Sequence, residues 1–146
     1  MLAMKYIEKL KSLALEFRSA IMQCDPETLP DGLQDFPHGA CGDTALLLAK
    51  YLRDHECGKF DYVLGEREGY THAWLQQGAL IVDITADQFD DNDLAIFVSV
   101  DHRWHFKFKG MVENMADLDC YDEYTAGCLQ AAYEKILAHV PYKPKA

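Results

Sequence analysis

The spacing of apolar residues changes from a helical period to a strand period midway along the chain. Apolar residues recur at helical spacing over residues 3–23 and 42–54, which predicts two helices. The second contains the run ALLLAKYL, which is apolar on nearly every side, so we expect this helix to be buried. Beyond it the period becomes two, which predicts three strands, at residues 61–66, 71–76 and 79–85.

The turns between the predicted strands are short, with REG and QG at their centres. Strands that follow one another through short turns are antiparallel, so the fold class is α+β rather than a wound α/β sheet. We also expect a second hairpin from residues 95–100 and 104–108, and a final helix over 125–139. The 146 residues suffice for one domain, 1–146, and no repeat or linker divides them.

The charge balance is strongly acidic, with 24 Asp and Glu residues against 14 Lys and Arg and a net charge of −10. This balance argues against nucleic acid and anionic lipid as partners, because phosphate contacts need clustered basic side chains. It would attract a basic substrate or partner. No segment approaches the roughly 18 apolar residues of a membrane span, and the charged N-terminal segment does not resemble a secretory signal. The five cysteines are therefore expected to be reduced thiols in the cytoplasm.

One cysteine stands where a loop passes into the buried helix. In PHGACGDTALLLAKYL, Cys41 is at or just before the first turn, and Asp43 and Thr44 are at capping positions. Unpaired backbone N–H groups and the positive end of the helix dipole favour a thiolate there. The preceding loop, up to residue 40, is long for a small domain, so we expect it to line a cleft. A packed, inert thiol is the alternative for an isolated cysteine.

A histidine and an aspartate fall on neighbouring predicted strands. If the turn within THAWLQQGALIVDIT is centred on Gln77 and Gly78, His72 lies directly opposite Asp83, with Cβ atoms roughly 4.5–5.5 Å apart. An aspartate in an apolar strand needs such a partner, because an unpaired buried carboxylate is costly. A loop of odd length would send the two side chains to opposite faces. Trp74 is expected to share the face of His72, either shielding the imidazole from water or serving as plain core.

A cysteine, a histidine and a carboxylate together suit covalent acyl transfer. The thiolate would attack a carbonyl, the imidazole would move the proton, and the carboxylate would orient the ring. We expect the backbone N–H of Cys41 to stabilise the oxyanion. A side-chain donor could come from Gln34, His38 or Gln88, each of which could equally be an exposed loop residue.

These motifs resemble the papain-like cysteine hydrolase superfamily, and most closely its transglutaminase-like branch. The resemblance rests on GACGDTALLLAKYL, HAWL and IVDIT, and HAW followed by Asp about ten residues later also resembles transglutaminase-like bacterial proteases that trim leader peptides. It implies a buried nucleophile helix packed on an antiparallel sheet, with Cys41 as nucleophile, His72 as general base and acid, and Asp83 as orienting residue. It further implies attack on an amide or acyl carbonyl of a protein or peptide through a thioester, without a cofactor. Hydrolysis, deamidation and transfer to an amine all remain open.

A metal site is one alternative reading of the same residues. Structural zinc sites usually show paired, closely spaced cysteines or histidines. Here the close pairs are His38 with Cys41, which His72 and Asp83 could complete, and His102 with His105, beside a turn where exposed histidines are common. We therefore expect no metal.

A non-catalytic interaction module of the immunity or adaptor type is the other alternative. Function lies in sites rather than folds, so such a module could use the same scaffold. The acidic run from Asp117 to Glu123 suits a protein of this kind, although such runs are more often solvated surface. Selective alkylation of Cys41 over the other four cysteines would favour the enzyme.

Overall fold

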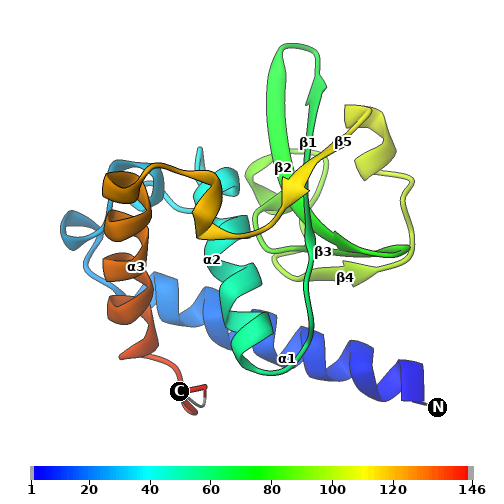
Figure 1. Ribbon diagram of the computed structural model, residues 1–146. Helices are drawn as coiled ribbons and strands as arrows, with labels where there is room; N and C mark the ends of the chain where they lie inside the picture. Colours follow the sequence, from blue (N-terminus) through cyan, green and yellow to red (C-terminus); the bar gives the residue numbers. More distant parts are fainter. Residues whose placement is uncertain (1, 145–146) are drawn as a thin grey trace.

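A computed structural model describes residues 2–144 of the chain (Figure 1), which form helices on one side and a five-stranded antiparallel sheet on the other. The strand order is β4-β3-β2-β1-β5. The predicted α+β class is confirmed. The helices are α1 (Leu2–Gln23), α2 (Cys41–Asp54) and α3 (Glu123–Leu137), and the strands are β1 (Asp61–Arg67), β2 (Tyr70–Gln77), β3 (Leu80–Asp83), β4 (Phe97–Ser99) and β5 (Met111–Met115).

The sheet has an apolar cluster on each face. In Figure 1, α2 lies between α3 and the sheet, and α1 runs beneath. Leu75 and Val82 are buried in the large core that the helices form. Trp74 and Ile81, their neighbours in sequence, belong instead to a smaller cluster with Phe108. Because side chains alternate along a strand, this second cluster lies on the opposite face of the sheet.

Helix α2 is buried along most of its length, as its apolar sequence predicts. It begins at Cys41, and Ala40 occupies the N-cap position. The first backbone bond of the helix joins Thr44 N–H to the carbonyl of Ala40, 2.9 Å away. Asp43 and Thr44 therefore lie inside the first turn, and the prediction that they cap the helix was wrong. Ala40 has no side-chain oxygen, so the N-cap residue leaves the first amides of α2 unpaired.

The hairpin between β2 and β3 turns one residue later than the sequence suggested. Gln77 pairs with Leu80 and Leu75 pairs with Val82, so the turn consists of Gly78 and Ala79. Gly78 adopts φ +59°, a conformation that glycine accepts readily. The predicted register, which paired Leu75 with Leu80, was wrong by two positions. An even shift leaves every side chain on its predicted face.

The predicted second hairpin is only half correct. Residues 97–99 form β4, which pairs with β3, but 104–108 are not a strand. They include the 3-10 turn η4 (His105–Phe108), whose two end residues are both buried. A turn can direct both side chains into the cluster beneath the sheet, whereas a strand would alternate them. Strand β5 was not predicted, because it is a largely exposed edge strand with little apolar alternation.

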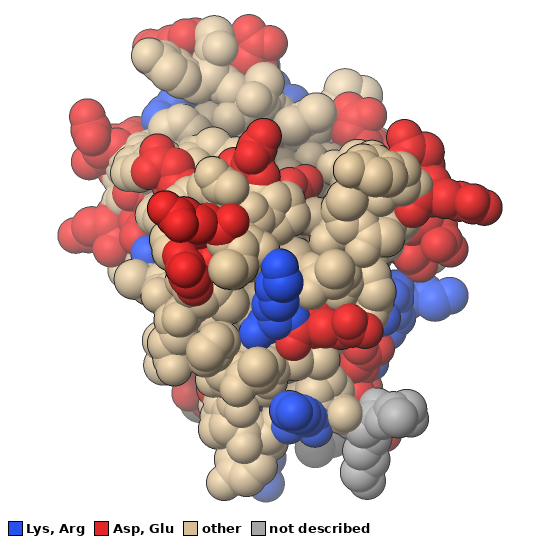
Figure 2. Space-filling view, turned by 90° about the vertical axis from the view of Figure 1, so that its left-hand side faces the viewer, with Lys and Arg blue, Asp and Glu red and all other residues tan. Residues whose placement is uncertain are grey.

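Among the charged side chains that Figure 2 shows, acidic ones are more prominent than basic ones, and Lys and Arg form a few separate spots. All five cysteines lie within the described residues and all are free. Among residues 2–144, no helix combines the length and the apolar character that crossing a bilayer requires.

Candidate active site

Cys41 is the first residue of α2 and is partly exposed. Gly39, two residues before it, has φ +66°, and this left-handed conformation turns the loop into the helix. The sulfur thus lies at the positive end of a buried helix, among amides that have no partner within the helix. This position stabilises an anion, either a thiolate or the oxyanion of a substrate.

His72 and Asp83 form a buried hydrogen-bonded pair. His72 Nε2 lies 2.6 Å from Asp83 Oδ2, and the two residues are 0% and 2% exposed. The register makes them diagonal rather than direct neighbours, since Val82 is already paired with Leu75. Their shared face and the end of β3 at Asp83 still let the side chains meet.

Asp83 is surrounded by donors on both oxygens. Oδ2 also accepts from His105 Nε2 at 2.7 Å, and Oδ1 accepts from the backbone N–H of Thr85 at 2.9 Å. Burial would raise the pKa of Asp83, but the charge of His72 and the bonds from both histidines outweigh burial and hold this pKa well below its usual range. Asp83 is therefore an ionised carboxylate held in one orientation.

The environment of His72 favours its protonated form. Burial lowers the pKa of His72, but the charge and hydrogen bond of Asp83, together with the nearby Cys41 side chain, overcome burial and raise the pKa to about 9. Because Nε2 is bonded to Asp83, Nδ1 is the nitrogen available to Cys41. The arrangement supports an imidazolium beside the sulfur and an oriented ring.

Aromatic rings close around the imidazole of His72. Trp74 lies on the same face, as its position predicts, with ring centroids 5.7 Å apart. Phe89, Trp104 and Phe108 approach from the segments beneath the sheet, at 5.1, 5.7 and 5.4 Å. These rings exclude water, which strengthens the interaction between His72 and its charged partner.

The three predicted side-chain oxyanion donors have different surroundings. Gln88 Nε2 lies 3.5 Å from His72 Nδ1, and Gln88 Oε1 accepts from Gly39 N–H at 3.3 Å, so this residue joins the loop before the nucleophile to the histidine. His38 lines a pocket together with Gln88. Gln34 is exposed and donates to the carbonyl of Leu29 at 2.9 Å. Of the three, Gln88 is the one that contacts the His72 imidazole.

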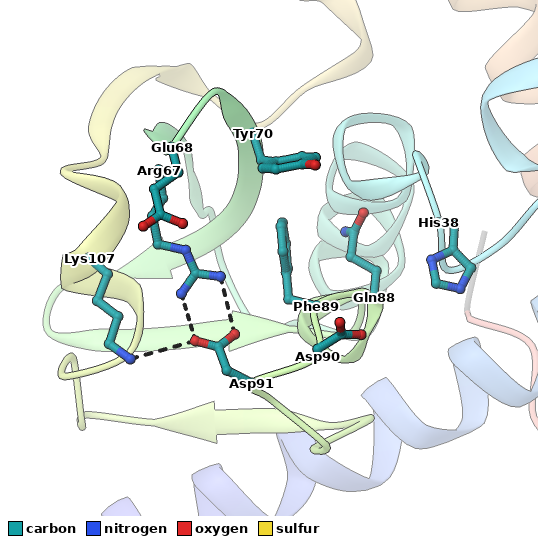
Figure 3. Close-up of a pocket in the computed structure, with 9 residues that line it drawn as sticks. All are labelled: His38, Arg67, Glu68, Tyr70, Gln88, Phe89, Asp90, Asp91 and Lys107. Carbon is teal, nitrogen blue, oxygen red and sulfur yellow. Dashed lines mark hydrogen bonds and ion pairs between the residues drawn. The ribbon is translucent and has the colours of Figure 1, made fainter.

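A pocket of about 740 Å³ opens beside Gln88, close to the His72–Asp83 pair (Figure 3). Gln88 and His38 lie on one side of it, and the tip of the β1–β2 hairpin lies on the other. Cys41 and His72 do not line it, so Gln88 is the link between pocket and pair. The expected cleft therefore involves the β1–β2 hairpin. Its lining residues are His38, Arg67, Glu68, Tyr70, Gln88, Phe89, Asp90, Asp91 and Lys107.

His72, Asp83 and His105 could also be considered as metal ligands, because their ligand atoms all lie within 4.8 Å of one another. The separations of 2.6 and 2.7 Å match hydrogen bonds. Ligand atoms of a tetrahedral zinc site, at Zn–N distances of about 2.0–2.1 Å, would stand roughly 3.3 Å apart. His38, the first residue of the metal set considered from sequence, is not in this cluster.

Sequence reasoning missed the role of His105. It treated the residue as half of an exposed pair with His102, whereas His105 is 1% exposed and bonded to Asp83. The signal available was the density of aromatic residues around it, in WHFKF, which favours burial.

Comparisons of this chain with protein-family models, with curated proteins and with solved structures found no match. The case for a function therefore depends on the geometry around Cys41, His72 and Asp83. Fold alone would not supply it, because one scaffold serves many chemistries.

Proposed function

We propose that this protein is a thiol-dependent hydrolase or acyltransferase that attacks an amide or peptide carbonyl through a thioester on Cys41. The observation that carries the proposal is the buried His72–Asp83 pair, joined at 2.6 Å, beside a cysteine at the start of a buried helix. A nucleophile next to a base that a third group orients is the general requirement for this chemistry.

The reaction would run in two halves. The Cys41 sulfur attacks the carbonyl carbon, and the tetrahedral intermediate collapses as the C–N bond breaks and His72 gives its proton to the leaving amine. A water molecule or a second amine then attacks the thioester carbonyl and gives its proton to His72. The C–S bond breaks, which releases the acid or the new amide and returns Cys41 and His72 to their starting state. Asp83 stays ionised and holds the ring throughout.

The start of α2 would stabilise the oxyanion. The backbone N–H of Cys41 is among the helix's first amides, which lack intrahelical acceptors. Gln88 is the side-chain donor we favour, because its amide nitrogen already lies 3.5 Å from His72 Nδ1. Gln88 would have to exchange its bond to the Thr85 carbonyl, 3.0 Å long, for one to the substrate.

The papain-like core, in its transglutaminase-like form, is part of this proposal. The elements that support it are a buried helix with the cysteine at its first position, packed against a strand that carries the histidine. The aspartate follows at the end of the next antiparallel strand. A cytoplasmic location, which the reduced cysteines favour, would keep the nucleophile available.

The substrate we propose is a protein or peptide with a basic residue near the scissile carbonyl. The pocket beside Gln88 contains the carboxylates of Glu68 and Asp90 and the exposed ring of Tyr70 (Figure 3). Carboxylates and aromatic faces together suit a Lys or Arg side chain. The overall charge of −10 would steer such a segment toward the protein.

Alkylation with iodoacetamide at neutral pH tests the proposed nucleophile. Cys41 should react faster than Cys24, Cys57 and Cys120, since burial raises the pKa of these three thiols. His72→Ala should slow the reaction of Cys41 without changing that of Cys120, which serves as the internal control. Peptide mapping by mass spectrometry gives the rate at each site.

Trapping of the acyl-enzyme tests the chemistry itself. Incubation with a library of basic peptides should leave a mass adduct on Cys41 that Cys41→Ser abolishes while the fold persists. Uniform, slow alkylation of all five cysteines and the lack of any adduct would instead favour the non-catalytic interaction module.

A further inference from the structure

His105 is a buried titratable residue that the proposed reaction does not use directly. It lies at the start of η4 and is 1% exposed. Its Nε2 atom lies 2.7 Å from Asp83 Oδ2, the same oxygen that His72 Nε2 reaches at 2.6 Å. A single carboxylate oxygen thus joins two imidazoles.

The surroundings of His105 indicate which nitrogen carries the proton. Its Nε2 faces a carboxylate, so Nε2 must be the donor. Its Nδ1 is buried and has no hydrogen-bond partner among residues 2–144. His105 therefore donates a hydrogen bond to Asp83 through Nε2–H.

Asp83 needs such a donor when the charge on His72 changes. In the proposed reaction His72 gives up its proton, and the fully buried carboxylate then loses its cationic partner. Loss of a nearby positive charge raises the pKa of a buried carboxylate. A neutral His72 still donates Nε2–H to Oδ2 but no longer carries a charge, so the bonds from His105 to Oδ2 and from the Thr85 N–H to Oδ1 become more important for the carboxylate.

We propose that His105 is a positioning residue whose Nε2–H holds the Asp83 carboxylate ionised and directed at His72 throughout the reaction cycle. This inference rests on the proposed function of the same site. His105 touches neither the substrate nor the reacting atoms, and it acts through Asp83.

Packing alone does not account for a histidine at this position. The rings of Phe97, Trp104 and Trp74 surround His105, with centroids 4.6, 4.8 and 4.9 Å away. An apolar side chain would fill such a site without leaving a buried nitrogen unpaired. The hydrogen bond to Asp83 is what an apolar residue could not supply.

Two substitutions separate the donor from the volume. His105→Leu keeps an apolar side chain but removes the donor, whereas His105→Gln keeps an N–H that can reach the carboxylate. We expect His105→Leu to lower the rate of Cys41 alkylation by about 10- to 100-fold. With a substrate identified by acyl-enzyme trapping, kcat should fall by the same factor while KM changes little. His105→Gln should recover most of this loss. The acid limb of the pH–rate profile should move to higher pH in His105→Leu, because the ionised carboxylate has lost a donor.

Titration of the His72 ring by ¹⁵N NMR provides a readout that needs no turnover. His105→Leu should alter this titration, and His105→Gln should return it toward that of the unsubstituted protein. If a folded His105→Leu variant shows unchanged reaction rates and an unchanged His72 titration, His105 only fills space. The same conclusion follows if both variants lose reaction rate equally because both unfold. If Cys41 shows no selective alkylation, the proposed function fails, and the His72 titration alone decides this inference.

Discussion

His72 and Asp83 meet although they are not partners in the β-ladder. At the open end of the β2–β3 hairpin, the last backbone pair is Leu75 with Val82. His72 Nε2 nevertheless lies 2.6 Å from Asp83 Oδ2. Both side chains point to the face opposite the helices, where aromatic rings cover them. The pair is therefore buried under aromatic rings, and Cys41 reaches His72 from the first residue of α2.

The His72–Asp83 pair should make stability depend on pH. The pKa of His72 is raised from 6.5 to about 9 in the folded state, so protonation of His72 favours folding. This contribution is fully present below pH 6.5 and is lost as the pH rises through about 9. The pKa change corresponds to a loss of free energy of unfolding on the order of 3 kcal/mol, and solvent screens it little because the ring is buried. Urea unfolding at a series of pH values measures it.

The matched variant for this experiment is His72→Gln, which removes the titrating group. It should be less stable overall, because Asp83 loses its cationic partner, and it should lack the decline between pH 6.5 and 9. The difference between the two proteins cancels the titration of other groups. A parallel decline in both proteins would contradict the assignment.

Arg18 should be required for both stability and the site. Its guanidinium bonds both oxygens of Asp87 at 2.8 Å and the carbonyl of Ile84 at 2.6 Å, which ties α1 to the turn that follows β3. That turn carries Gln88. Arg18→Ala should lower the free energy of unfolding by about 3–5 kcal/mol, since it leaves a partly buried carboxylate unpaired, and should slow alkylation of Cys41.

The control for this substitution is an exposed pair of the same type. Arg103 also bonds an aspartate, Asp101, but its side chain is 90% exposed. Arg103→Ala should change the free energy of unfolding much less than Arg18→Ala does, and should leave alkylation unchanged. Similar losses for Arg18→Ala and Arg103→Ala would show that the link to the turn has no special role.

The pocket beside Gln88 should select basic substrates. Asp91 is already paired with Arg67 at 2.7 Å and with Lys107 at 3.6 Å, whereas Asp90 makes no such ion pair among the described residues (Figure 3). Asp90→Asn should therefore reduce the formation of the Cys41 adduct with Lys- or Arg-containing peptides by about 3- to 10-fold, and more at low salt. Mass spectrometry of the adduct measures this.

A substitution of an exposed acidic residue outside the pocket gives the comparison. Glu134→Gln removes the same charge from α3 and should have little effect on the adduct. Equal reductions in Asp90→Asn and Glu134→Gln would point to the overall charge of the protein. Equal rates for basic and acidic peptides would refute the selectivity.

Local spacing in the sequence was sufficient for several features of the site. A helical stripe that begins directly after a loop places Cys41 at a helix start, because the period of an α-helix is set by its own backbone. A strand period places His72 and Trp74 on one face. The shared face of His72 and Asp83 was predicted even though the register was wrong, since an error of two positions leaves the faces unchanged.

The tertiary structure alone decided the rest. The 3-10 turn that brings His105 to Asp83 depends on the burial of Phe108 and its neighbours beneath the sheet, which no local period records. The link from Arg18 to Asp87 joins residues 69 positions apart. Periodicity reports which side a residue faces, because it follows from local backbone geometry. Which groups then meet depends on how the separate elements pack, and that is a property of the whole chain.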